Sequence, residues 1–169
     1  MGVDATELGR PELKELFGFW RQARRGDAVP VLGSVSPVDV APYLSQIVMV
    51  EIEHPDDRVR FLQVGRALTP VLGDDLEGRY LDTLPRGLRV NVEETYRTML
   101  AERAPQHAEF EIAGDDWVVL FERLMLPFRA ARTDRIAGAM VAIYPRISIT
   151  KRAPVSGSEV GARDAVVAA

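Results

Sequence analysis

The sequence predicts an α+β domain in which one antiparallel sheet of five strands carries the helices. Three observations lead to this fold class. Five β-rich runs occur as a pair and then a triple, helical patterns stand before and between these groups, and turn residues separate neighbouring runs. Strands joined by short turns pair antiparallel, whereas parallel strands need longer crossovers. The domain is expected over residues 10–145, after a flexible lead at residues 1–9 and before a mobile tail at residues 146–169.

The N-terminal helix is predicted over residues 10–25. Its apolar side chains recur at the i, i+3, i+4, i+7 spacing that marks one face of an α-helix. Gly26 follows a basic last turn, at the position of a C-cap glycine. The apolar face either packs on the chain's own domain or forms a contact surface for a second copy or another protein, and both can hold. The residues concerned are Leu13, Leu16, Phe17 and Trp20.

The middle of the chain is expected to alternate strands with short helical turns. Residues 47–52 and 59–64 are β-rich and are separated by the turn sequence His-Pro-Asp-Asp at residues 54–57, which predicts a hairpin. A short helix is expected near residues 37–44, and further helical turns and loops follow the hairpin. A longer amphipathic helix is then expected over residues 88–103.

The last third of the chain predicts three strands, over residues 107–112, 117–126 and 136–144. The middle one is apolar on both faces except at Glu122 and Arg123, which is typical of a central strand covered on both sides. A buried guanidinium needs a partner, and Glu122 points to the opposite face of the strand. We expect either a salt bridge at the sheet edge or a contact of Arg123 with an acidic ligand or a partner subunit.

The composition excludes several classes of function. The chain has 21 basic and 25 acidic residues, a net charge of −4, and no cysteine. The lack of a basic surplus argues against nucleic-acid binding. The lack of cysteine excludes disulfides, a thiolate nucleophile and cysteine-bound metals. No apolar run reaches the roughly 18 residues of a membrane span, and no secretory signal is evident. We expect a cytoplasmic protein that binds neither nucleic acid nor membranes.

No catalytic, metal or cofactor site is predicted. His54 and His107 stand outside the spacings that bind zinc. No Gly-x-Ser-x-Gly elbow occurs, the glycines are too dispersed for a phosphate loop, and the acidic group at residues 74–77 does not match a calcium loop. A small enzyme with a cone-shaped cavity would need an acid–base pair in its pocket, for which only Glu93 or Glu94 is available. An enzyme is therefore disfavoured.

A family pattern is carried by five segments: Phe19-Trp20-Arg21, Ser36-Pro37-Val38-Asp39-Val40-Ala41-Pro42-Tyr43-Leu44, Arg60-Phe61-Leu62-Gln63-Val64-Gly65-Arg66-Ala67-Leu68, Gly73-Asp74-Asp75-Leu76-Glu77-Gly78-Arg79 and Glu122-Arg123-Leu124-Met125-Leu126-Pro127-Phe128. In combination they resemble a bacterial PAS-like family common in alphaproteobacteria, many members of which stand alone. The similarity covers about residues 15–144. It implies a five-stranded antiparallel sheet with helices across one face, and frequent homodimers that use the N-terminal helix.

The resemblance also implies a small cavity between the sheet and the helices. Residues 88–103 contain neither cysteine nor histidine, so the photoadduct and haem versions of such a domain are not expected, and no cofactor is predicted. A small-molecule ligand remains an open alternative. The candidate cavity residues are Met49, Phe61, Tyr96, Met99, Trp117 and Arg123.

The favoured function is that of a single-domain signalling or regulatory protein that acts through protein–protein contacts. We expect a homodimer and a regulatory protein partner, with or without modulation by a small ligand. The tail is too short for an effector domain, so the output would be a changed surface. The alternative is a ligand sensor or carrier without a protein output. Residues 166–169, Val-Val-Ala-Ala, are either an unconstrained terminus or a degradation signal.

Overall fold

The computed structural model describes residues 3–73, 76–84, 86–113, 118–146 and 167–168. Its strands form one antiparallel sheet in the order β2-β1-β5-β4-β3-β6. They are β1 (Ile47–Glu53), β2 (Arg58–Val64), β3 (Gln106–Ala113), β4 (Val118–Arg129), β5 (Ile136–Arg146) and β6 (Val167–Ala168). The helices are α1 (Pro11–Ala23), α2 (Pro37–Val40), α3 (Thr69–Leu72) and α4 (Arg86–Glu102), with 3-10 helices η1 (Ala41–Gln46) and η2 (Leu81–Thr83). The predicted α+β fold with five antiparallel strands is confirmed, and the two-residue β6 adds an edge to the sheet.

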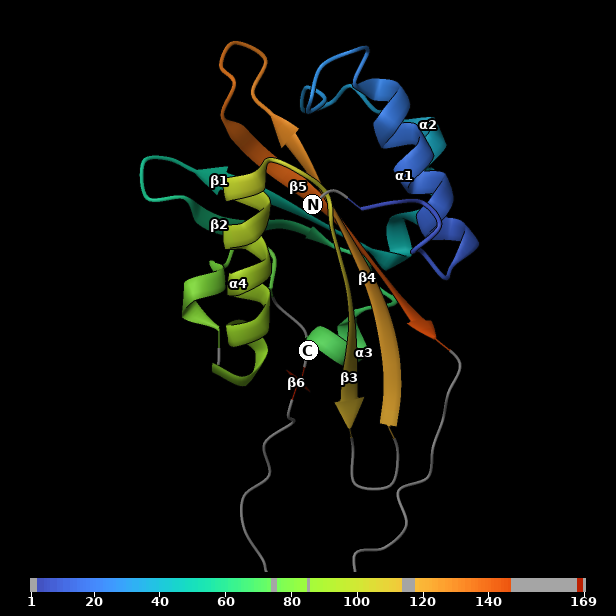
Figure 1. The fold of residues 1–169 in the computed structure, drawn as a ribbon. Helices are drawn as coiled ribbons and strands as arrows, with labels where there is room; N and C mark the ends of the chain where they lie inside the picture. Colours follow the sequence, from blue (N-terminus) through green and yellow to red (C-terminus); the bar gives the residue numbers. More distant parts are fainter. Residues whose placement is uncertain (1–2, 74–75, 85, 114–117, 147–166, 169) are drawn as a thin grey trace, which may run out of the picture.

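Helices cover both faces of the sheet, with α1 and α2 on the side away from α4 (Figure 1). Met125 lies opposite Val141 in the β4–β5 register, and both side chains line a space under α4. Successive side chains of a strand alternate between its faces. The neighbouring Met140 accordingly lies on the other face, where it lines a groove with Val40 of α2. The expectation of helices across one face therefore holds for α3, η2 and α4, and α2 joins α1 on the opposite face.

Helix α1 packs its apolar face on the chain's own sheet. Trp20 also donates a hydrogen bond from Nε1 to the carbonyl oxygen of Pro127 in β4, at 2.7 Å. The apolar residues of this helix face are between 0% and 5% exposed: Leu13, Leu16, Phe17 and Trp20. They are core residues of a single chain and do not form an exposed contact surface, because the sheet already removes them from water. This corrects their assignment as partner surface, while the homodimer itself stays a prediction.

The end of the predicted flexible lead is fixed to the sheet. Leu8 is buried, and the backbone amide of Gly9 donates to Glu122 Oε1 in β4 at 2.7 Å. The ordered domain therefore begins before residue 10. Of the predicted tail, the structure describes residues 146 and 167–168, so the expected mobility and most of the candidate degradation signal lie outside the described residues.

Candidate ligand cavity and adjoining groove

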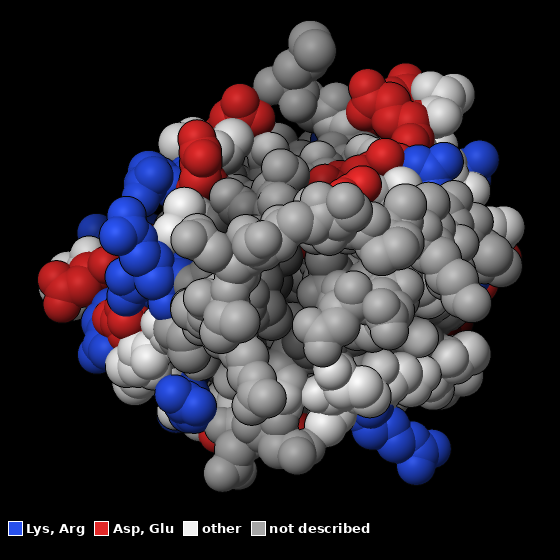
Figure 2. All heavy atoms as spheres, turned by 90° about the horizontal axis from the view of Figure 1, so that it is seen from below, with Lys and Arg blue, Asp and Glu red and all other residues white. Residues whose placement is uncertain are grey.

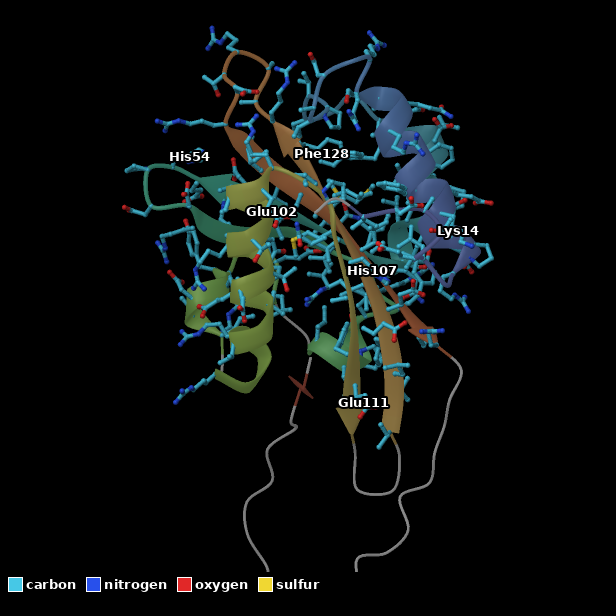
Figure 3. The ribbon with its side chains drawn as sticks, in the orientation of Figure 1. Lys14, His54, Glu102, His107, Glu111 and Phe128 are labelled. Carbon is cyan, nitrogen blue, oxygen red and sulfur yellow. The ribbon has the colours of Figure 1, made fainter. Side chains whose placement is uncertain are left out.

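A small cavity of about 50 Å³ lies between α4 and the sheet. Side chains of α4 and of the strands project into the space between these ribbons (Figure 3). Among the described residues, the cavity wall is apolar apart from Tyr96 of α4 and Arg123 of β4. Its apolar residues are Val48, Phe61, Leu72, Leu76, Leu81, Leu84, Val92, Met125, Val141 and Ile143. The wall thus suits a small, largely apolar guest.

The structure distributes the predicted cavity residues over several places. Phe61, Tyr96 and Arg123 stand on the cavity wall. Met99 is fully buried in the core without lining the cavity, and Met49 lies on the opposite face of the sheet, in an apolar groove beside α2. Trp117 lies outside the described residues.

The sequence-based reasoning missed the contribution of β5 to the wall. Val141 and Ile143 stand opposite Met125 and Arg123 in the β4–β5 register, and directly opposed residues of an antiparallel pair share a face. The signal was the period-two alternation along β5. It identifies a face only once the partner strand and its register are known.

Arg123 is the only cationic side chain on the cavity wall as far as the structure describes it. It is 4% exposed, its Nη2 donates to Thr95 Oγ1 of α4 at 2.7 Å, and its guanidinium carbon lies 5.5 Å from the ring centre of Phe110. Its Nε is buried and has no hydrogen-bond partner among the described residues. Burial lowers the pKa of Arg123, although an arginine keeps its charge at neutral pH. No described carboxylate forms an ion pair with it, so the expected edge salt bridge is not found there.

Tyr96 stands between the cavity and the molecular surface. Its side chain is 4% exposed, and burial raises the pKa of its phenol well above the ordinary value, an effect that the charge of Arg123 partly offsets. The phenol is therefore neutral at physiological pH. In the part of the chain that the structure describes, Tyr96 and Leu81 are the two residues that line both the cavity and a groove outside it.

This groove, of about 610 Å³, opens between the β1–β2 hairpin and α4. Its apolar part comes from Val59, Leu81 and Leu100. The charged groove residues are four carboxylates and two guanidinium groups: Asp56, Asp57, Asp82, Glu93, Arg58 and Arg97. Basic and acidic side chains are interleaved along the side of the molecule that carries α4 (Figure 2). The groove thus combines apolar with charged side chains, and acids outnumber bases among its described residues.

Several of the charged groove residues already form ion pairs within the protein. Arg58 donates from Nε and Nη2 to the two oxygens of Asp82, at 2.8 and 3.1 Å, and these hydrogen bonds hold the pKa of Asp82 below its usual value. The guanidinium of Arg58 also lies 3.8 Å from the ring centre of Tyr80. Asp57 contacts Nδ1 of His54 at 2.6 Å. Such pairs hold the groove side chains in place more than they stabilise the fold, because exposed ion pairs contribute little to the free energy of folding.

Glu122 is a second buried charge, on the opposite face of β4 from Arg123. It is 0% exposed and accepts hydrogen bonds from the Gly9 amide and from Nε2 of His107 on β3, at 2.7 and 3.0 Å. These contacts tie the chain segment before α1 to the sheet. The predicted separation of Glu122 and Arg123 onto two faces is confirmed by these partners, so the two do not neutralise each other.

The described residues contain no group of three or more histidine, cysteine or carboxylate side chains that could hold a metal ion. No helix among them has both the length and the apolar character needed to cross a bilayer.

The chain matches a known protein family over most of its length. A family model described as PAS domain matches residues 9–141. The chain belongs to the PAS domain family. PAS domains are typically sensory rather than catalytic, so this PAS domain is a signalling or sensory domain.

Among solved structures, the chain is similar to the PAS domain of histidine kinase ThkA. The two are 20% identical, with a TM-score of 0.41, and the match covers 58% of this chain and 95% of that one. No curated protein matches the chain.

Proposed function

We propose that this PAS domain is a regulatory module that acts through protein–protein contacts at the groove and that a small ligand in the cavity modulates those contacts. The observation that supports this proposal is the double position of Tyr96, which lines the inner cavity and the outer groove at once. A guest that displaces Tyr96 must alter the groove, because packed interiors leave side chains little free volume. Leu81 of η2 offers a second route of the same kind.

The groove has the composition of a recognition surface. Protein interfaces commonly combine an apolar, well-packed centre with a polar rim. Here Val59 and Leu100 supply apolar surface, and the described groove residues include two more carboxylates than guanidinium groups. Complementary charge speeds association and selects partners. The expected partner therefore presents a segment with apolar anchors flanked by basic side chains.

A charge change in the groove is expected to abolish partner binding. The double variant Asp56→Lys/Asp57→Asn removes negative charge at the hairpin tip, and asparagine tolerates the left-handed backbone of Asp57, where φ is 54°. Proteins that co-purify with the tagged full chain from its source cells are quantified by mass spectrometry. We expect their specific recovery to fall at least tenfold with this variant.

A matched control is Asp39→Lys, an exposed carboxylate on α2 at the opposite face. It changes the net charge in the same direction without touching the groove. Partner recovery with Asp39→Lys should stay within about twofold of the unmodified chain. Loss with Asp39→Lys and retention with the groove variant would place the contact surface elsewhere and refute the groove.

A ligand carrier without protein output is the second candidate function. The observation that favours it is Nε of Arg123, which is buried and has no hydrogen-bond partner among the described residues. The two functions differ in what the groove does when the cavity fills. A carrier leaves the groove unchanged, whereas a regulatory domain remodels it.

A further inference from the structure

We propose that the cavity binds a short-chain aliphatic monocarboxylate through the guanidinium of Arg123. This inference rests on the proposed function and deepens it by naming the class of ligand. The inference starts from the buried guanidinium of Arg123, whose hydrogen-bonding groups are only partly paired among the described residues and which stands on a largely apolar cavity wall.

The buried cationic side chain of Arg123 would be stabilised by an anionic partner. Removing a charge from water is costly unless it is paired and hydrogen-bonded. Arg123 is 4% exposed, yet the described residues provide only the neutral hydroxyl of Thr95 and the ring face of Phe110. The residues on either side of it in β4, Glu122 and Leu124, point to the other face. The missing partner is therefore to be sought in a ligand.

The donor geometry matches a carboxylate. A guanidinium presents a planar fork of N–H groups that bind the two oxygens of a carboxylate as a pair of parallel hydrogen bonds. Among the described residues, Nε of Arg123 has no partner, and Thr95 is the one hydrogen-bond partner found for the adjacent Nη2, which carries two N–H groups. Nε and Nη2 form the side-on edge of the guanidinium fork, and a carboxylate bound there would accept one hydrogen bond from each nitrogen.

The other residues of the cavity wall indicate the net charge of the ligand and the polarity and length of its tail. Arg123 is the single cation on the described wall, and Tyr96 is the only other polar residue there, as a neutral phenol. A second carboxylate would have no cation to meet. Val48, Phe61 and Val141 present apolar surface to whatever extends from the carboxylate. The ligand is thus a monoanion with an apolar tail, and a volume of about 50 Å³ keeps that tail short.

An entry route follows from the position of the groove. Leu81 and Tyr96 separate the cavity from the groove, where Arg97 provides a cation at the surface. Rotation of the Tyr96 ring away from Leu81 would join the two spaces. An anion drawn to the groove would then reach the guanidinium of Arg123 from the side of α4.

Calorimetry and thermal unfolding of the full chain test the proposal, with butyrate as the probe and butyramide as its uncharged counterpart. Butyrate at 100 times its dissociation constant should raise the melting temperature by about 5–10 °C, and butyramide should not. Arg123→Met keeps the length of the apolar stem and removes the charge. It should weaken butyrate binding at least tenfold, while Lys14→Gln, at an exposed position of α1 on the opposite face, should leave it within about threefold.

Two further arms use the unmodified chain, so that the test survives if Arg123→Met does not fold. The Nε–H resonance of Arg123, observed by ¹⁵N NMR, should move downfield with butyrate, as expected for a new hydrogen bond to a carboxylate. Chloride and phosphate, added at the same ionic strength, should leave it in place. An unmoved resonance with butyrate would refute the ligand, and an equal shift with phosphate would replace the carboxylate class with inorganic anions.

The results also separate this inference from the function on which it rests. Groove-dependent partner binding without any binding of butyrate overturns the ligand and leaves the regulatory function standing. Butyrate binding to a chain whose groove variant retains every partner supports the ligand and overturns the groove.

Discussion

Replacing Trp20 with alanine is expected to lower the free energy of unfolding by about 3–5 kcal/mol. The indole is 2% exposed, stacks on Phe17 with ring centres 6.1 Å apart, and donates to the carbonyl of Pro127 at 2.7 Å. The substitution removes this packing, leaves a cavity between α1 and β4, and orphans a buried acceptor. Urea unfolding followed by circular dichroism measures the change.

Two controls divide this loss into its parts. Trp20→Phe keeps an aromatic ring against Phe17 but cannot donate to Pro127, so a loss of about 1–3 kcal/mol is expected. Lys14→Ala changes an exposed position of α1 (Figure 3) and should stay within about 0.5 kcal/mol. The effect of Trp20→Ala should not depend on protein concentration, because the contacts lie within one chain. If the loss of stability disappeared at high protein concentration, Trp20 would have to contribute to a contact between subunits.

Replacing Gly138 with alanine is expected to destabilise the protein by about 1–3 kcal/mol. Gly138 lies in β5, and a Cβ atom there would stand 2.5 Å from the carbonyl oxygen of Val50 in the neighbouring β1. Backbone atoms cannot yield as a flexible side chain can, so the two strands must separate locally. The β1–β5 pairing joins the β1–β2 hairpin to the rest of the sheet. Thermal unfolding of the purified variant measures the loss.

Gly18→Ala is the matched control for this substitution. Gly18 lies inside α1, and a Cβ atom there would meet nothing within 4 Å. Alanine favours the helix over glycine by about 0.5–1 kcal/mol, so the variant should be more stable than the natural chain. The same chemical change is thus expected to act with opposite signs at the two positions. Stabilisation by both would contradict the close approach of β1 and β5.

The order of the elements could be predicted from the sequence because it depends on local patterns. Residues close together in the sequence are enough to predict three features: the helical period of α1, the turn at residues 54–57 and the apolar strand around Arg123. The extent of β4 was less accessible. The sequence predicts a strand over residues 117–126, yet β4 continues to Arg129 because its pairing with β5 persists beyond the last residue that β3 contacts.

The candidate site could be predicted only in part, because its assembly depends on long-range register. The apolar stripe of α1 was recognised, but nothing in its spacing distinguishes packing on the chain's own sheet from packing on a second copy. Met49 alternates with Val48 and Val50 along β1, and only the pairing with β5 decides which of them faces α4. Arg123 could be singled out early because a guanidinium in an apolar strand is unusual wherever the strand pairs.

Tyr96 and Leu81 line both the cavity and the groove, and backbone amide chemical shifts can observe directly whether a signal passes between the two spaces. Uniformly ¹⁵N-labelled full chain is titrated with butyrate, and the resonances of Asp82, Glu93 and Arg97 are followed beside those of the cavity wall. We predict that the groove amides shift with the same dissociation constant as Arg123, while Lys14 on the opposite face stays in place. Saturation of the cavity with unmoved groove amides would contradict a regulatory domain and leave a carrier.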